Sequence, residues 1–239
     1  MNTERQPPFR IPHSAFRIPH SNDPHSAIKV FIQAGGRSSR MKQDKAWLEV
    51  DGAPMIERVV AAAGPAAGRL GIIVNAANPQ IERYERLAES CDGGLIFDLH
   101  EHLGPLGGVH TALAHCGAAR SALILACDLP FITTDLLTFL CEIHQAPIPH
   151  SPFPTPPAVT VPLDQSNRPQ PLAAIYDKSL EATVGQMLAA NELRVDLLYS
   201  RVSTRLISFA EFANLRDAER FFINVNTPEE YLAALHRIS

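Results

Sequence analysis

The chain has 239 residues, of which 46% are hydrophobic, so it can form one large domain with a substantial core. Its net charge of −4 at pH 7 argues against a general nucleic-acid-binding protein, because such proteins carry a basic excess. No apolar run approaches the roughly 18 residues of a membrane span, and the first residues lack the basic-then-apolar order of a secretory signal. The four cysteines form no CxxC pair, which favours a reduced, cytoplasmic compartment.

Residues 1–27 differ from the rest of the chain. The sequence FRIPHS starts at Phe9 and is repeated from Phe16, without helical or strand periodicity. Its frequent prolines remove backbone donors and block helical geometry, so we expect a disordered tail. Residues 28–239 are expected to form a single domain.

From Ile28 onward, short apolar runs alternate with helical segments. Expected strands span 28–33, 70–75, 94–98, 121–126, 157–162, 171–176, 203–208 and 221–225. Expected helices span 54–63, 78–90, 105–116, 133–145, 178–190 and 227–237. This alternation predicts an α/β fold with three layers, in which a mainly parallel, Rossmann-like sheet is covered on both faces. Ligands bind such sheets beyond the carboxyl ends of the strands, so the loops after strands are the candidate site.

The loop after the first expected strand reads AGGRSSR, from Ala34 to Arg40. Two glycines after a strand let the backbone approach a ligand and point successive amides at an anion. The surrounding cations are Arg37, Arg40, Lys42 and Lys45, and Ser38 and Ser39 add hydroxyl donors. This combination suits a triphosphate, although the loop matches neither GxxxxGK[ST] nor GxGxxG. The alternative is a tight turn flanked by solvated cations.

The stretch AGGRSSRMKQDKAWLEVDGAPMIERV, from Ala34 to Val59, resembles the signature LAGGxSxRMGxDKxxLxxxGxPxxxxV of the cofactor nucleotidyltransferases. Within that group, the double glycine and the DK pair resemble the molybdenum cofactor guanylyltransferases. The chain departs from the signature where Gln33 replaces the usual Leu and Lys42 replaces the usual Gly. The resemblance implies a fold of the nucleotide-diphospho-sugar transferase type.

Two further loops agree with this resemblance. Asn75 ends the run IIVN, and the resemblance implies that it contacts the nucleotide; a turn cap is the alternative. Asp98 ends LIFD, and the resemblance implies that its carboxylate accepts hydrogen bonds from the N1–H and the exocyclic amine of guanine. Gly104 and Gly107 follow in GPLGG. The glycines at 107 and 108 open a helix where a bulky side chain would collide with the ligand; a flexible helix entry is the alternative.

The segment LILACDLP places Asp128 at the end of an apolar run. A lone acid there is costly unless a cation meets it, and Mg²⁺ takes one or two carboxylates together with phosphate oxygens. Asp128 resembles the metal-holding aspartate of the family. Capping of the next helix is the alternative, although Thr133 suits that position better. Cys127 is interpreted as a small packing residue.

Two motifs complete the resemblance. The segment QPLAAIY, which begins with Gln170 and Pro171, is similar to a block that lies on the acceptor side in the family. The segment NVNTPEE is similar to the family's closing motif, which would bring Asn224 and Asn226 near the metal. Its TPEE sequence also predicts a capping box that starts at Thr227.

The implied reaction is the transfer of GMP from GTP to the terminal phosphate of molybdopterin or molybdenum cofactor, with release of pyrophosphate. Mg²⁺ is the implied cofactor, no nucleic acid or membrane is expected to bind, and molybdoenzyme maturation proteins are further candidate partners. The implied catalytic residues are Lys45, Asp128 and Arg40. The implied GTP-binding residues are Gln33, Ala34, Gly35, Gly36, Arg37, Ser38, Lys45, Asn75, Asp98, Gly104, Gly107 and Asp128. The alternatives are a cytidylyl- or sugar-phosphate nucleotidyltransferase of the same fold, or a non-catalytic nucleotide-binding domain.

Overall fold

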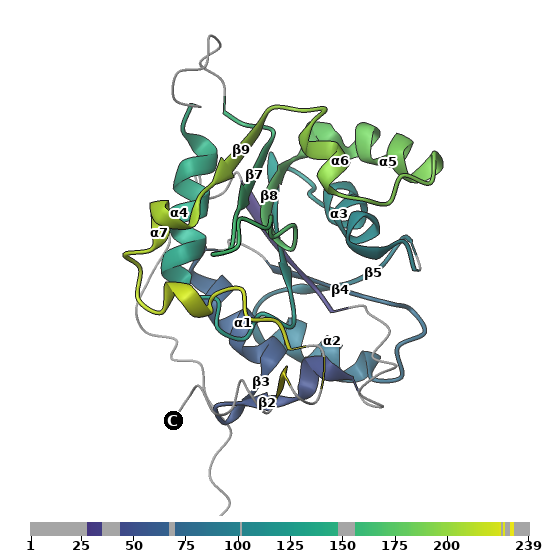
Figure 1. The fold of residues 1–239 in the computed structure, drawn as a ribbon. Coiled ribbons are helices and arrows are strands. Elements are labelled where there is room, and N and C mark those ends of the chain that lie inside the picture. Colours follow the sequence, from purple (N-terminus) through teal and green to yellow (C-terminus); the bar gives the residue numbers. More distant parts are fainter. Residues whose placement is uncertain are drawn as a thin grey trace, which may run out of the picture.

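A computed structural model describes residues 28–34, 44–66, 70–100, 102–147, 156–225, 227 and 230–231. Within these ranges the chain forms a seven-stranded sheet in the order β5-β4-β1-β6-β8-β7-β9 and a two-stranded ribbon of β2 and β3 (Figure 1). The strands are β1 (Ile28–Gln33), β2 (Glu49–Val50), β3 (Ala53–Pro54), β4 (Leu70–Val74), β5 (Gly94–Phe97), β6 (Ser121–Ala126), β7 (Val159–Pro162), β8 (Ala173–Asp177) and β9 (Thr204–Ile207). The expected tail, residues 1–27, lies outside the described residues.

Helices cover both faces of the sheet, which confirms the three-layer α/β prediction (Figure 1). The α-helices are α1 (Met55–Ala63), α2 (Ile81–Ser90), α3 (Gly104–Ala114), α4 (Thr134–Gln145), α5 (Glu181–Ala189), α6 (Asp196–Tyr199) and α7 (Phe209–Phe212). Short 3-10 helices are η2 (Lys45–Trp47), η3 (Gly64–Ala66), η4 (Lys178–Leu180) and η5 (Ala218–Arg220). Buried side chains of α1, α2, α4 and α7 pack on one face, and those of α3, α5 and α6 pack on the other.

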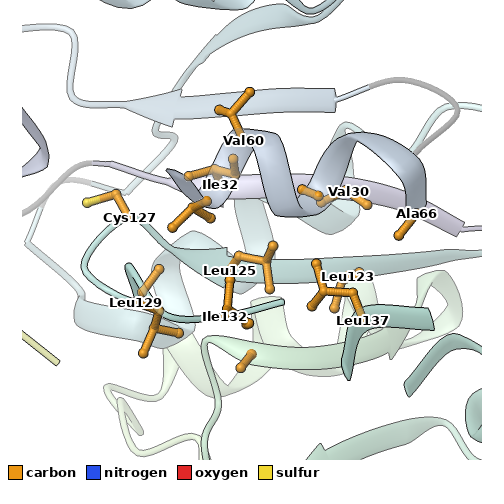
Figure 2. Close-up of a cluster of buried hydrophobic side chains, with 14 of the residues drawn as sticks. Val30, Ile32, Val60, Ala66, Leu123, Leu125, Cys127, Leu129, Ile132 and Leu137 are labelled. Atoms are coloured by element: carbon orange, nitrogen blue, oxygen red, sulfur yellow. The ribbon is translucent and has the colours of Figure 1, made fainter. Parts of the chain in front are cut away.

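The central strand β1 contributes to both hydrophobic layers because its side chains alternate between the two faces. Val30 and Ile32 belong to the layer with α1 and α4, whereas Phe31 faces α3. Figure 2 shows Val30 and Ile32 beside Leu123 and Leu125, their register partners on β6. All of these side chains are fully buried, and each contributes about 1.5–3 kcal/mol of transfer free energy to folding. The sheet therefore holds the carboxyl ends of β1 and β6 rigidly next to each other.

The sheet is mainly parallel, as predicted, but β8 runs antiparallel to both of its neighbours, β6 and β7. The physical reason is the short connection from β7 to β8, which contains no helix among the described residues. A parallel crossover needs about a dozen residues or more, usually with a helix, so a direct return produces an antiparallel pair. The carboxyl end of β8 consequently points away from the candidate site.

The prediction of a strand at 221–225 is wrong. These residues form a turn and an irregular segment, in which the backbone N–H of Ile223 bonds to the carbonyl of Arg220 at 3.1 Å. The apolar run has a different use, because Phe221 is fully buried and its ring stacks on Phe212 with centroids 6.4 Å apart. Of the helix expected at 227–237, residues 227, 230 and 231 are described, and 230–231 are helical. The capping box is confirmed by the reciprocal hydrogen bonds of Thr227 and Glu230.

The ribbon of β2 and β3 was not predicted, although its sequence carries a clear signal. Asp51 and Gly52 connect the two strands with φ values of 54° and 76°, as a type I′ turn requires. Arg58 from α1 joins this ribbon to the loop after β6, donating to the carbonyls of Val50 and Pro130. Among the described residues, no helix has the length and apolar character needed to cross a membrane.

Candidate active site

Lys45 and Asp128 meet at the edge of the sheet formed by the strand carboxyl ends. The Nζ of Lys45, at the start of η2, donates to the Oδ2 of Asp128, which follows β6. The exposed fractions of the two side chains are 20% and 11%, so water reaches both only partly. The cation of the expected phosphate loop and the expected metal-holding acid are therefore in direct contact.

The backbone around Asp128 explains why its carboxylate lies there. Cys127 donates its N–H to the carbonyl of Gln33 at 3.2 Å, which continues the pairing of β6 with β1 beyond the strand ends. Val225 donates its N–H to the carbonyl of Asp128 at 3.3 Å, which brings the segment containing exposed Asn224 to this edge. Burial raises the pKa of the Cys127 thiol, and the Asp128 charge adds to this rise. Cys127 is therefore a protonated packing residue, as predicted.

Asp98 lies on the α3 side of the same edge. Its Oδ1 accepts hydrogen bonds from the hydroxyl of Thr111 at 2.7 Å and from the backbone N–H of His100 at 3.1 Å. Its own N–H bonds to the carbonyl of Val74 at 2.8 Å, so the carboxylate is fixed at the end of the sheet. Its Oδ2 accepts no hydrogen bond from the residues that the structure describes. Among the described residues, hydrogen bonds therefore hold one carboxylate oxygen and not the other.

Gln33 and Gly108 are in close contact between β1 and α3. A Cβ atom placed on Gly108 would lie 2.2 Å from the Nε2 of Gln33, so a glycine at this position leaves room for the amide. Gln33 is 8% exposed, and its buried Oε1 has no hydrogen-bond partner among the described residues. A buried acceptor without a donor is unusual and unfavourable. A side chain at position 108 would therefore collide with Gln33. At Gly104 the φ of 66° favours glycine.

Asn75 and the acceptor-side residues make local hydrogen bonds. The Oδ1 of Asn75 accepts from the N–H of Ala77 at 2.7 Å, so in this structure the side chain caps a turn, which was the alternative interpretation. Gln170 donates to Asp164 at 3.3 Å, and the carbonyl of Pro171 accepts from the hydroxyl of Tyr176 at 2.9 Å. The next residue on this side reaches β6, because Ala126 donates its N–H to the carbonyl of Leu172 at 2.8 Å.

Part of the predicted site is not described by the structure. Ala34 is buried, and its N–H bonds to the carbonyl of Ile73 at 2.8 Å, which anchors the start of the loop. The predicted residues outside the described ranges are Gly35, Gly36, Arg37, Ser38, Arg40 and Asn226.

Asp128 is the residue of this site whose side chain suits Mg²⁺. Within the described ranges, no three His, Cys, Asp or Glu side chains gather into a group that could hold a metal alone. Mg²⁺ usually keeps water and substrate phosphate among its ligands and takes only one or two carboxylates from the protein. Asp128 fits that requirement because its carboxylate is partly exposed at the strand edge, next to a cation suited to phosphate.

Three residues near the site were missed by the sequence interpretation. Asp44 accepts from the hydroxyl of Tyr84 at 2.7 Å, and Thr111 holds Asp98 as described above. Asp44 had a signal, since it is the acid of the DK pair in the family signature. Tyr84 and Thr111 had none, because a single polar residue in an apolar helix face does not reveal its partner.

Comparisons with known proteins identify relatives of this chain. The family model described as "MobA-like NTP transferase domain" matches residues 30–203. A probable molybdenum cofactor guanylyltransferase of Pelotomaculum thermopropionicum is 34% identical over 85% of this chain and 89% of the relative. A molybdenum cofactor guanylyltransferase of Burkholderia ambifaria is 33% identical over 91% of this chain and 99% of the relative. Molybdopterin-guanine dinucleotide biosynthesis protein A of Archaeoglobus fulgidus shares the fold, with a TM-score of 0.70 at 21% identity over 88% and 98% of the chains. The chain therefore belongs to the MobA-like NTP transferase family of nucleotidyltransferases.

Proposed function

We propose that the chain transfers GMP from GTP to the terminal phosphate of molybdopterin or molybdenum cofactor and releases pyrophosphate. The observation that carries the proposal is the contact between Lys45 and Asp128 at the strand carboxyl ends. It joins a phosphate-binding cation to a metal-binding acid in the place where this fold class binds ligands. The names of the relatives at 33% and 34% identity support guanine as the base and the molybdenum cofactor as the acceptor.

The residues act by positioning and by neutralising charge. An oxygen of the acceptor phosphate attacks the α-phosphorus of GTP, and the bond from that phosphorus to the pyrophosphate oxygen breaks. The attacking phosphate is already anionic, so no side chain has to remove a proton. Lys45, with the predicted Arg40, stabilises the negative charge that develops on the leaving pyrophosphate.

Asp128 is the residue that would hold Mg²⁺, whose chemistry is to neutralise phosphate charge and to orient the triphosphate. In the described structure the same carboxylate accepts from Lys45. We expect the ammonium of Lys45 to turn from Asp128 to the phosphates when the nucleotide binds. The two opposite charges keep each other partly neutralised until then.

Asp98 is proposed to select guanine. Its Oδ1 is occupied by Thr111 and His100, so Oδ2 is the oxygen that would accept from N1–H and the exocyclic amine of guanine. Cytosine presents two acceptors and one donor on its pairing edge, which a carboxylate satisfies poorly.

The test is a nucleotide panel with molybdopterin and Mg²⁺, in which pyrophosphate release is measured for GTP, CTP, ATP and UTP. We expect GTP to be used in preference to the other three. Faster release from CTP would contradict the role of Asp98, and GTP binding without release would favour a non-catalytic nucleotide-binding domain.

A further inference from the structure

Asp44, the residue before Lys45, is held by three hydrogen bonds. Its Oδ2 accepts from the hydroxyl of Tyr84 at 2.7 Å and from the Nδ2 of Asn78 at 3.1 Å. Its Oδ1 accepts from the N–H of Ala46 at 3.2 Å, so the same side chain caps η2. The turn that carries Lys45 is thereby tied to α2 and to the loop before it, 34 to 40 residues further along the chain.

The two side chains that donate to Asp44, Tyr84 and Asn78, are themselves held in place. Tyr84 is fully buried, and burial raises the pKa of its hydroxyl far above the ordinary value, with a further rise from the charge of Asp44. The hydroxyl is therefore protonated and donates. Asn78 accepts from the N–H of Gln80 at 2.8 Å through its Oδ1, which directs its amide nitrogen towards Asp44.

An aromatic contact strengthens the same connection. The ring of Trp47, at the end of η2, lies 5.0 Å from the ring of Tyr84, and the guanidinium of Arg83 lies 3.8 Å above Trp47. One face of α2 therefore holds both ends of η2. Lys45 has a long, flexible side chain, so fixing its backbone limits where its ammonium can lie.

We propose that Tyr84 and Asn78 are positioning residues that act through Asp44 to hold the ammonium of Lys45 at the triphosphate. This inference rests on the proposed function, because it takes a nucleoside triphosphate as the ligand of Lys45. Neither Tyr84 nor Asn78 contacts the ligand in this account. Their effect on binding must pass through Lys45, and this makes the inference separable from a general effect on folding.

The test is a double-mutant cycle of Tyr84→Phe and Lys45→Ala, in which calorimetry measures binding of GTP and of guanosine. Tyr84→Phe keeps the ring against Trp47 and removes only the hydroxyl. We expect it to weaken GTP binding about tenfold, the size of one charge-assisted hydrogen bond, and to leave guanosine binding within about twofold. In the Lys45→Ala background the same change is expected to alter GTP binding by less than about twofold, because the residue it acts through is gone.

Asn78→Ser gives a second variant, since a serine oxygen can still accept from Gln80 while the donor to Asp44 is lost. Asn78→Ser should also weaken GTP binding when Lys45 is present and change it little in the Lys45→Ala background. Tyr199→Phe is the matched control, because its hydroxyl lies 3.4 Å from that of Tyr176, on the other face of the sheet. We expect this control to bind GTP as the wild type does.

Three results would overturn the inference alone: equal losses with and without Lys45, equal losses for GTP and guanosine, or no loss in Tyr84→Phe. If the wild-type protein binds no GTP in Mg²⁺, the proposed function fails and the inference fails with it.

Discussion

The ammonium of Lys45 contacts the carboxylate of Asp128 across 83 residues of sequence. The contact joins the two sides of the candidate site, one from the segment after β1 and the other from the end of β6. Both side chains are largely shielded from water, so each charge depends on the other for part of its solvation.

The first prediction concerns the stability of this pair. Lys45→Met keeps most of the side-chain volume but leaves Asp128 without the ammonium, so we expect the free energy of unfolding to fall by about 1–3 kcal/mol at pH 7. Urea unfolding measures the change. Combining Lys45→Met with Asp128→Asn should restore part of the loss, because the unpaired charge is removed. If the losses of the two single variants simply add, the pair is not coupled as described.

The second prediction concerns base selection by Asp98. Asp98→Asn replaces one carboxylate oxygen with a donor, so we expect kcat/KM for GTP to fall about 10- to 100-fold and the preference for GTP over CTP to shrink. Asp92→Asn is the control, since Asp92 is exposed and asparagine tolerates its φ of 51°. An unchanged preference in Asp98→Asn would mean that another group reads the base.

The third prediction concerns Gln33. Gln33→Leu introduces the residue usual in the family and removes a buried acceptor that has no partner among the described residues. We expect the protein to gain about 1 kcal/mol of stability, which raises the midpoint of thermal unfolding by roughly 2–4 °C for a chain of this size. Exposed Gln165 provides the control, because Gln165→Leu should change the midpoint little. A clear loss of stability in Gln33→Leu would show that the amide has a partner in solution.

The fourth prediction concerns pH and the buried His144. Its ring nitrogens lie 3.0 Å from the hydroxyl of Ser121 and 2.9 Å from that of Thr160, and burial lowers its pKa from 6.5 to about 4. Of the charges that act on the ring, Asp177 raises this pKa and Arg120 lowers it.

Between pH 4 and 6.5 the unfolded chain binds the proton that folded His144 does not. The contribution of neutral His144 to the free energy of unfolding is therefore complete above pH 6.5. It is lost as the pH falls towards 4, by about 3 kcal/mol in total. Urea unfolding of the wild type and of His144→Leu should give slopes against pH that differ by about 1.4 kcal/mol per unit in this window. His102→Asn, at an exposed histidine, should follow the wild type, whereas parallel curves for His144→Leu would contradict the prediction.

The sequence predicted the elements whose pattern is local. The runs at 28–33 and 121–126 became strands with those bounds, because apolar residues buried on both faces admit few other structures. The run at 221–225 looked the same but packs Phe221 into an aromatic cluster instead of pairing with the sheet. Burial requires apolar residues in a strand and in a buried turn alike. Composition alone therefore could not tell that the run at 221–225 is a turn.

In the candidate site, too, some contacts could be predicted from the sequence and others depend on how the elements pack. The meeting of Lys45 with Asp128 could be expected, since strand carboxyl ends share one edge of a parallel sheet. The hydrogen bond from Tyr84 to Asp44 could not, because it depends on how α2 lies against η2. Gln33 was recognised as a departure from the family, but its contact with Gly108 needed the packing of α3 on β1.

The most direct test of the central claim is the rate of pyrophosphate release from GTP by Asp128→Ala, with molybdopterin and Mg²⁺ present. Asp135→Ala provides the control, because Asp135 is an exposed acid in the first turn of α4. We predict that Asp128→Ala lowers the rate at least about 100-fold, as expected when a main charge-stabilising group is removed, and that Asp135→Ala does not. A rate for Asp128→Ala equal to that of the wild type would contradict the account.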